Sequence, residues 1–466
     1  VTTDGIVAGR TERMARFQVL AMATVAWTTS AMSASITGFE AAASKLSTPP
    51  VVTGPTFNKK LSTPDGVPEA GQQRALELMR SGALFRYTPG VLSETSLAEE
   101  AICDYSGFGY AVGFNSCGSA LFIALKCVGV QPGDHVLANA FSFTAVPSAI
   151  HHAGAIPVFV ESTNAYTMDM DDLEAKITPA TKVLLLTHMR GKVTDMQRVY
   201  EIAEKHGLTV VEDCAHALGI KWDDVQLGRS SRIACFSTQS AKMINSGEGG
   251  FLCTDDEEAA ARAICYAGCY EKLIDDHVRA PPRAVFDAVK KETPNYSLRM
   301  SDLTACCVRP QIDTLEERIK VYNTRYEKVT ARLASCENIE VPAISERVRP
   351  VCDSVQFNLQ HFRPDQIASF LDHTKRRGMP LSLFGSKDNA RNFRNWKYSP
   401  IAVDVPKTEQ LISVAVDMRL PLSFEDEDFD QMADVVLAAI EDVHAEEPTA
   451  EGVALADEFA DIVPDV

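Results

Sequence analysis

Lys242 is the residue around which the chemistry of this sequence can be organised. It lies between hydroxyl residues and a glycine-rich turn, in the stretch 236–254 with the sequence FSTQSAKMINSGEGGFLCT. An amine activated by its neighbours and by desolvation can form a Schiff base with an aldehyde cofactor, and small residues let the backbone lie close to that cofactor. We therefore predict that Lys242 anchors pyridoxal phosphate (PLP). A solvated lysine before a turn is the alternative that this stretch alone leaves open.

Three predicted strand ends could bring other groups to Lys242. Residues 110–130 predict a strand, a turn of small residues and a helix that starts near Ser119, an arrangement that binds anions because free amides and the helix dipole point at the turn. The apolar strand LTVVED ends at Asp213, and the strand RIACFS leads into the lysine segment. Because ligands collect beyond the carboxyl ends of strands in open α/β sheets, these three turns are expected to converge.

The elements that carry these turns predict an α/β fold with a mainly parallel sheet between two layers of helices. Predicted helices end at Gly82 and Gly107, and others cover residues 171–177, 196–206, 257–268 and 301–334. A smaller α+β unit follows, with strands VQFNLQ and LISVAVDMR, helix 364–377, a loop at 384–400 and a closing helix. The predicted organisation is a leader (1–34), a linker or arm (35–67), a large domain (68–335), a small domain (336–444) and an acidic disordered tail (445–466).

Composition excludes several classes of function. A formal net charge of -18 disfavours nucleic-acid binding, which needs a basic face. The 12 cysteines contain no CxxC pair and have no partners at zinc-finger spacing, so we expect no metal site and reduced thiols. From Met14 a basic start, an apolar stretch and small residues resemble a leader for secretion or for import into an organelle such as a plastid; without it the protein would be cytoplasmic. The mature protein is expected to have no membrane span.

Eight motifs in a fixed order make the sequence similar to a known family. They are LMRSG, NSCGSAL, QPGDHVLANAFSFTAV, AGAIPVFVE, HMRGKVTDM, HGLTVVEDCAHALG, SGEGGFLCTDD and NYSLRMSDLTA. From about Gln72 to Ile440 the chain resembles the DegT/DnrJ/StrS family of PLP-dependent sugar aminotransferases. The resemblance implies the three-layer αβα fold of aspartate aminotransferase (fold type I) and PLP as the cofactor.

The resemblance also implies catalytic roles for three residues. Lys242 would be the Schiff-base lysine and the base that moves the proton, Asp213 would pair with the pyridine nitrogen of PLP, and His216 would lie near its phenolic oxygen. Ala215 is small enough to lie against the cofactor ring. Without the family pattern, Asp213 would be taken for a strand-end cap and His216 for a core histidine.

Further positions match residues that hold the cofactor in the family. Phe143 would stack on the other face of the ring, and Ser237 would bind the phosphate. The turn at Gly118 and Ser119 would supply helix-end amides, although Gly118 replaces a threonine common in relatives. Asn295 would reach the phosphate of a neighbouring subunit, so the resemblance implies a homodimer with shared sites.

Substrate binding is assigned to basic residues that depart from the family pattern or lie in a variable loop. Arg190 stands where relatives often have an aromatic residue, and it could bind a phosphate or carboxylate or lie on the surface. Lys387, Arg391 and Arg394 lie in the basic, aromatic loop 384–398, which suits an anionic or sugar-nucleotide substrate or is a solvated loop packed by its aromatic residues.

The resemblance therefore predicts an enzyme with small-molecule substrates. Glutamate or glutamine would donate an amino group, and a keto-sugar, often nucleotide-linked, or a keto-cyclitol would accept it in a ping-pong cycle. The alternatives are a PLP-dependent sugar dehydratase of the same family, in which the lysine is commonly replaced by histidine, and a non-catalytic PLP-binding regulatory protein. A dinucleotide-binding oxidoreductase is excluded because no GxGxxG turn follows an early strand.

Overall fold

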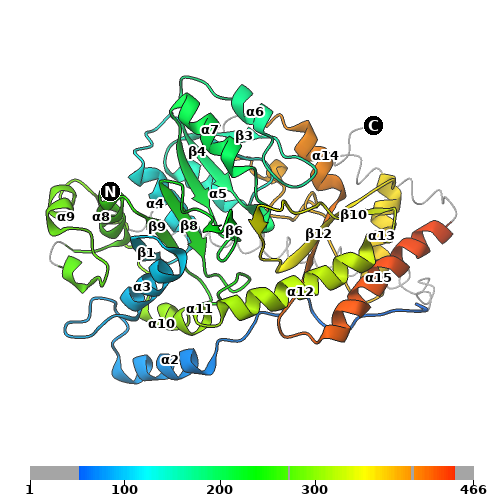
Figure 1. Ribbon diagram of the computed structural model, residues 1–466, viewed down its shortest axis with the longest axis horizontal. Coiled ribbons are helices and arrows are strands. Elements are labelled where there is room, and N and C mark those ends of the chain that lie inside the picture. The colour runs from blue at the N-terminus through cyan, green and yellow to red at the C-terminus, as the bar shows by residue number, and fades with distance from the viewer. Residues whose placement is uncertain (1–51, 271–272, 400–402, 447–466) are drawn as a thin grey trace, which may run out of the picture. The chain divides into compact units, whose positions relative to one another are not determined.

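A seven-stranded sheet forms the centre of the computed structural model, which describes residues 52–270, 273–399 and 403–446 (Figure 1). Its strand order is β1-β9-β8-β5-β4-β2-β3. The strands are β1 (Tyr110–Phe114), β2 (His135–Asn139), β3 (Ile156–Val160), β4 (Thr181–Thr187), β5 (Thr209–Asp213), β8 (Ile233–Ser237) and β9 (Gly250–Thr254). Only β9 among these strands runs against the others, because it pairs antiparallel with both β1 and β8. The predicted mainly parallel sheet is confirmed.

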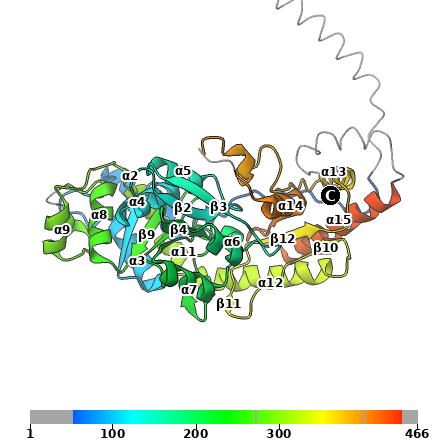
Figure 2. The ribbon, with the colours of Figure 1, turned by 90° about the horizontal axis from the view of Figure 1, so that it is seen from above.

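Two apolar cores cover the two faces of this sheet. One core packs α4 (Cys117–Cys127), α5 (Ala145–His152) and α8 (Glu257–Ala267) against one set of strand residues, and the other packs α3 (Glu94–Ser106) and α7 (Met196–His206) against the alternate set. In β4, for example, Leu185 belongs to the first core and Leu184 to the second. Figure 2 shows α4 and α5 on one side of the strands and α3 and α7 on the other. Strands buried on both faces read as continuous apolar runs, which is why the sequence predicts them well.

A separate three-stranded sheet has the order β10-β12-β13. It consists of β10 (Ile339–Glu340), β12 (Ser354–Leu359) and β13 (Ala415–Arg419), and α13 (Pro364–Arg376) and α15 (Asp426–Ala445) belong to the same region. The long helix α12 (Leu315–Leu333) runs from beneath the large sheet to α15 (Figure 1). The exact domain boundaries at 335 and 336 stay a prediction.

The remaining elements are short or peripheral. They are α2 (Glu69–Ser81), α6 (Met170–Ala175), η1 (Met189–Gly191), β6 (Lys221–Trp222), β7 (Val225–Gln226), η2 (Ile274–Asp276), α9 (Arg283–Val289), α10 (Asp302–Ala305), α11 (Arg309–Ile312), β11 (Val348–Arg349), η3 (Phe393–Asn395) and α14 (Pro406–Val414). The predicted leader and acidic tail lie outside the described residues, apart from the first positions of the tail. Among the residues that the structure describes, no helix combines the length and apolar character needed to cross a bilayer.

Two sequence predictions of secondary structure were wrong in detail. Residues 411–414 belong to helix α14, so the predicted strand LISVAVDMR is a strand only from Ala415. The predicted helix 301–334 is three helices, and Pro310 in the middle one starts a helix more readily than it continues one. Helix α4 begins at Cys117, near Ser119 as predicted, and the Ser116 side chain caps it by accepting from the Ser119 amide at 3.1 Å.

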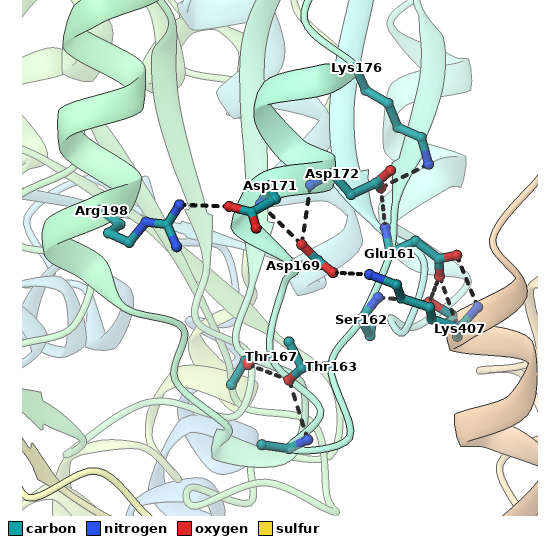
Figure 3. A network of polar contacts seen from close by, with 12 residues as sticks. Glu161, Ser162, Thr163, Thr167, Asp169, Asp171, Asp172, Lys176, Arg198 and Lys407 are labelled. Atoms are coloured by element: carbon teal, nitrogen blue, oxygen red, sulfur yellow. Dashed lines mark hydrogen bonds and ion pairs between the residues drawn. The ribbon is translucent and has the colours of Figure 1, made fainter.

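A polar network fastens α14 to the large sheet (Figure 3). Glu161, directly after β3, accepts hydrogen bonds from the amides of Lys407 and Thr408 at 3.0 and 2.8 Å. The Lys407 ammonium binds Asp169, and Asp172 accepts the Glu161 amide at 2.7 Å. The first amides of a helix have no hydrogen-bond partners within the helix. In α14 the carboxylate of Glu161, from a distant segment of the chain, accepts hydrogen bonds from two of these amides.

Candidate active site

A cavity of about 700 Å³ lies at the carboxyl ends of β5 and β8. Its walls come from the turns after strands of the large sheet, the end of β13, the segment 61–65, helix α12 and the loop that contains Arg391. Its lining includes Leu61, Ser62, Thr63, Pro64, Asp65, Ser116, Cys117, Gly118, Phe143, Arg190, Asp213, Ala215, His216, Ser237, Gln239, Ser240, Lys242, Glu248, Tyr322, Arg391 and Arg419. Residues far apart in sequence therefore meet where a parallel sheet is expected to bind a ligand.

Lys242 lies on the cavity wall in the turn between β8 and β9. The turn is closed by backbone hydrogen bonds, including Ser240 N to Gly247 O at 3.0 Å and Thr238 N to Gly249 O at 3.1 Å. Burial and the Arg190 cation lower the pKa of Lys242 to about 7, while Asp213 acts in the opposite direction. A neutral amine is therefore accessible near neutral pH, and an amine must be neutral to act as a nucleophile.

His216 is the direct partner of this amine. Its Nε2 lies 2.6 Å from Lys242 Nζ. Burial first, and then the cation of Lys242, hold the pKa of His216 well below its ordinary value. A neutral imidazole can accept a hydrogen bond from the lysine through its unprotonated nitrogen.

Asp213 is the last residue of β5 and is buried. Its Oδ1 accepts a hydrogen bond from the Ala215 amide at 3.1 Å, which orients the carboxylate. Burial raises the pKa of Asp213, and the Ala215 amide and the Lys242 cation partly offset that effect. The carboxylate is thus held in an environment that favours a cationic or proton-bearing partner.

The start of α4 offers an anion site. Within the described part of the chain, the amides of Cys117 and Gly118 have no hydrogen-bond partner, and both residues line the cavity together with Ser237. A Cβ added at Gly118 would meet its nearest atoms only at 3.8 Å, so the site has room beside the backbone. Free amides, the helix dipole and a hydroxyl form a donor set that fits a phosphate.

Gly250 makes this arrangement possible. A Cβ on this residue would lie 2.5 Å from the Cys117 amide nitrogen. Only glycine therefore lets β9 pass against the start of α4. The sequence predicted a glycine-rich turn here, but it did not predict that the turn continues into a central strand.

The structure brings most of the predicted site residues to the cavity. Lys242, Asp213, Ala215, His216, Gly118, Phe143, Ser237, Arg190 and Arg391 all line it. Phe143 is 40% exposed, and the Arg391 guanidinium lies 5.6 Å from the centre of its ring. Arg190, for which a surface position was the alternative, is buried.

Four predicted residues lie outside the cavity lining. Ser119 donates its hydroxyl to Asn115 Oδ1 at 2.7 Å, and Ser116 lines the cavity in its place. Lys387 is exposed, and Arg394 forms an ion pair with Glu409. Asn295 accepts from the Ser297 amide at 2.7 Å, away from the cavity of its own chain.

Sequence reasoning missed two parts of the wall. Arg419 ends β13 and donates a hydrogen bond to Ala241 O at 3.0 Å, next to the lysine. The segment 61–65 was assigned to a linker, but Asp65 binds Tyr322 and accepts from Asn245 through its carbonyl. The alternating charges of Asp417 and Arg419 in a predicted strand were the one signal that could have located this wall.

The chain is similar to known proteins along most of its length. The model of the DegT/DnrJ/EryC1/StrS aminotransferase family matches residues 69–437. The spore coat polysaccharide biosynthesis protein SpsC of Bacillus subtilis (strain 168) is 34% identical over 237 residues, which cover 50% of this chain and 59% of SpsC. The GDP-perosamine synthase of Caulobacter vibrioides is 30% identical over 241 residues, which cover 51% of this chain and 62% of that protein.

The fold comparison extends further than the sequence comparison. The crystal structure of 3-amino-5-hydroxybenzoic acid synthase has a TM-score of 0.71 and 23% identity, and it covers 84% of this chain and 100% of its own. The alignments to SpsC and the perosamine synthase span about three fifths of those relatives. Because the family model matches well over half of the sequence, the chain belongs to the DegT/DnrJ/EryC1/StrS aminotransferase family.

Proposed function

We propose that the protein is a PLP-dependent aminotransferase that moves an amino group from glutamate or glutamine to a keto-sugar or keto-cyclitol in a ping-pong cycle. One observation carries this proposal: a lysine with a pKa of about 7 shares a cavity with a buried carboxylate and a free helix N-terminus. Those three features match the aldehyde, the ring nitrogen and the phosphate of PLP. Family membership supports the same chemistry.

The cofactor would supply an aldehyde that condenses with amines and an electron-withdrawing ring. The residues of the protein would hold the cofactor and substrate in position and would transfer the proton of the substrate carbon. Asp213 would hold a proton at the ring nitrogen, and the amides of Cys117 and Gly118 with Ser237 would bind the phosphate. Lys242 would move the proton of the substrate carbon, and His216 would orient the Nζ atom at 2.6 Å.

The names of relatives and the size of the cavity support the proposed acceptor class. One relative is named for a GDP-linked product, and a volume of about 700 Å³ accommodates a cofactor and a sugar. The presence of Lys242 favours an aminotransferase over the dehydratases of the family. The retention of Lys242, Asp213 and His216 in hydrogen-bonded or charge-coupled positions favours catalysis over a purely regulatory role.

A homodimer belongs to this proposal. Phe85 and Tyr270 are exposed aromatic residues, and exposed apolar side chains that lie together can mark interaction surfaces. The guanidinium of Arg299 lies 5.6 Å from the ring of Phe85 and 5.9 Å from that of Tyr270. Asn295 lies in the same region, within 3.2 Å of a Cβ placed on Gly268, next to Arg299. The family resemblance supports the proposal that a second copy binds here and that Asn295 reaches its cofactor.

The test is cofactor attachment followed by an amino-donor reaction. The purified protein should show a visible absorption band that borohydride reduction fixes to Lys242, as found by peptide mass spectrometry. Lys242→Ala should lose the attachment and lower the rate with L-glutamate by roughly 10³–10⁴-fold. Lys182→Ala is the matched control, because Lys182 is exposed on β4 and outside the cavity lining.

Two outcomes would contradict the proposal. A protein that binds no PLP would rule out the cofactor assignment. A protein that binds PLP at Lys242 but reacts with neither glutamate, glutamine nor alanine would exclude transamination and favour a binding or regulatory role.

A further inference from the structure

Three arginines line one wall of the cavity, and the protein neutralises them unequally. Arg190, Arg391 and Arg419 come from three different segments. Arg190 forms an ion pair with Asp417, whose other oxygen accepts from Gln356 at 3.0 Å. This first arginine is therefore matched by a carboxylate of the small sheet.

Arg419 is also paired with a carboxylate, that of Asp353. Its Nη1 lies 3.2 Å from Asp353 Oδ2, and its Nη2 donates to Ala241 O. The cross-strand register places Ser354 opposite Arg419 and Gln356 opposite Asp417. Successive residues of a strand point to opposite faces, so positions 354 and 356 of β12 and 417 and 419 of β13 form one polar row. Hydrogen bonds of 2.8 to 3.0 Å link Asp353, Ser354, Gln356 and Asp417 along it.

Arg391 differs from the other two. Among the described residues it forms no ion pair with a carboxylate; its guanidinium lies 5.6 and 5.8 Å from the ring centres of Phe143 and Phe384. Its Nε atom is buried and has no hydrogen-bond partner in the described structure. Burial and the cations of Arg190 and Arg419 lower the pKa of Arg391 to about 10, and the Asp417 carboxylate opposes them. An anion beside Arg391 would remove this imbalance.

The backbone of Arg190 adds an independent observation. Its φ and ψ angles are 54° and 29°, a left-handed conformation that is rare for a residue with a long side chain. Its Nε atom is also buried without a partner among the described residues. Strained backbone at a cavity wall is typical of a residue held for function. Arg190 thus lines the same cavity as Arg391 in a backbone conformation that its surroundings must hold.

Other acidic groups at the cavity do not supply the missing charge. Asp65 is bound by Tyr322 at 3.1 Å and lies 3.8 Å from Arg318, and Glu248 is exposed. Arg190 and Arg419 are paired with Asp417 and Asp353, and Asp213 accepts from the Ala215 amide and not from an arginine, so the guanidinium charge of Arg391 has no carboxylate partner among the described residues.

We propose that Arg391, assisted by Arg190, forms a subsite for one anionic group of the substrate, a carboxylate or a phosphate, separate from the anion site at the start of α4. A planar guanidinium fork suits either group. This inference rests on the proposed aminotransferase function for its biological meaning. The anion has two possible sources, a carboxylate of the amino donor or an anionic group of the keto acceptor.

Succinate binding tests the subsite without any catalytic step. Calorimetric titration should show binding to the PLP-saturated protein, and Arg391→Met should weaken it by roughly 10- to 100-fold, the value of a lost charge-assisted hydrogen bond. Arg391→Lys should give an intermediate affinity, because it keeps the charge but loses the fork. Lys397→Met, which removes an exposed charge from the same loop, should bind as the original protein does. Succinamide, which has no charge, should bind weakly to all four proteins.

The two half-reactions then identify the source of the anion. If the donor carboxylate binds at Arg391, Arg391→Met raises the KM for L-glutamate by roughly the same 10- to 100-fold. If the acceptor supplies the anion, the glutamate reaction of Arg391→Met stays normal. The reaction of the amine-loaded form with a uridine-diphosphate keto-sugar then weakens, while the reaction with neutral scyllo-inosose does not.

The subsite and the proposed function fail in different ways. A protein that binds no succinate, or an Arg391→Met protein that binds it as tightly as the original and has unchanged half-reactions, overturns the subsite. Absence of any reaction with amino donors overturns the aminotransferase proposal, while the succinate titration still measures the subsite. Thermal unfolding of each variant shows that the compared proteins are folded, and Arg391→Lys replaces Arg391→Met if the latter unfolds.

Discussion

Two buried regions of this protein contain the same kinds of charged groups but treat them in opposite ways. The first is the cluster of Arg86, Glu99 and His277 beneath the edge of the large sheet. Arg86 donates to both oxygens of Glu99 at 2.8 and 3.0 Å and lies 3.1 Å from His277 Nδ1. Glu99 also accepts from the Gly113 amide of β1 at 2.8 Å. Despite the opposing effect of burial, Arg86 and His277 lower the pKa of Glu99 to about 2.

The second region is the cavity around Lys242. Here burial dominates: it raises the pKa of Asp213 and, with Arg190, lowers that of Lys242 to about 7. The carboxylate receives one backbone hydrogen bond from Ala215, and no arginine contacts it among the described residues. Both groups are held in surroundings that disfavour their charged forms.

The difference separates a structural ion pair from a candidate catalytic site. In the cluster Arg86 and Glu99 are paired with each other through two hydrogen bonds, so removal of one partner leaves a buried charge without compensation. In the cavity the charged forms of Lys242 and Asp213 are disfavoured until a ligand stabilises them. Ionisable groups with such shifted pKa values are found at functional sites. Variants of one carboxylate in each region can test this contrast directly.

The largest expected effect on stability comes from Glu99→Gln. It should lower the free energy of unfolding by roughly 3–5 kcal/mol, because Arg86 stays buried without a counter-charge. Denaturant unfolding followed by circular dichroism measures the loss. Glu258→Gln is the control: its ion pair with Arg262 is on the surface, with the Glu258 side chain 59% exposed, and should contribute less than about 1 kcal/mol. Equal losses in the two variants would contradict the structural role of the cluster.

Asp213→Asn should show the opposite behaviour. The rate with L-glutamate should fall by roughly 10²–10³-fold, the usual cost of losing one electrostatic contact to the reacting group. The melting temperature of the protein stripped of PLP should stay the same or rise, because a neutral amide replaces a carboxylate whose charged form is penalised by burial. Glu99→Gln, measured beside it, should lose stability while its folded fraction keeps the normal rate. A large loss of stability in Asp213→Asn with a normal rate would assign Asp213 to the structural class.

The same contrast explains what could be predicted from sequence. Asp213 and the turn before Lys242 follow apolar strands, and parallel topology places such strand ends together. Their convergence therefore followed from local patterns and element order. The roles assigned to these residues rest on the family resemblance and remain predictions.

The other wall depends on contacts that local patterns do not encode. Arg419 donates a hydrogen bond to Ala241, which lies 178 positions away in the sequence. Glu161 accepts a hydrogen bond from the first turn of helix α14, at a residue 246 positions away. The segment 411–414 has the apolar, β-branched composition of a strand, but this distant cap and Pro406 make it helical. Tertiary contacts, not intrinsic propensity, therefore decided both the helix and the position of the arginine wall.

The smallest expected effect is a change in the pH at which Lys242 loses its proton. Its amine is nucleophilic only when neutral, so its labelling should increase as the pH rises through about 7, well below the ordinary lysine value of 10.5. Competitive labelling of the PLP-free protein with trace acetic anhydride, read by peptide mass spectrometry, measures the midpoint, and the exposed Lys182 reports on the reagent. Arg190→Met should move the midpoint to higher pH, because the Arg190 cation is the strongest charge that disfavours the ammonium form. A midpoint near 10.5 in the original protein would mean that the cavity does not activate the amine, and the contrast between the two regions would then rest on Asp213 alone.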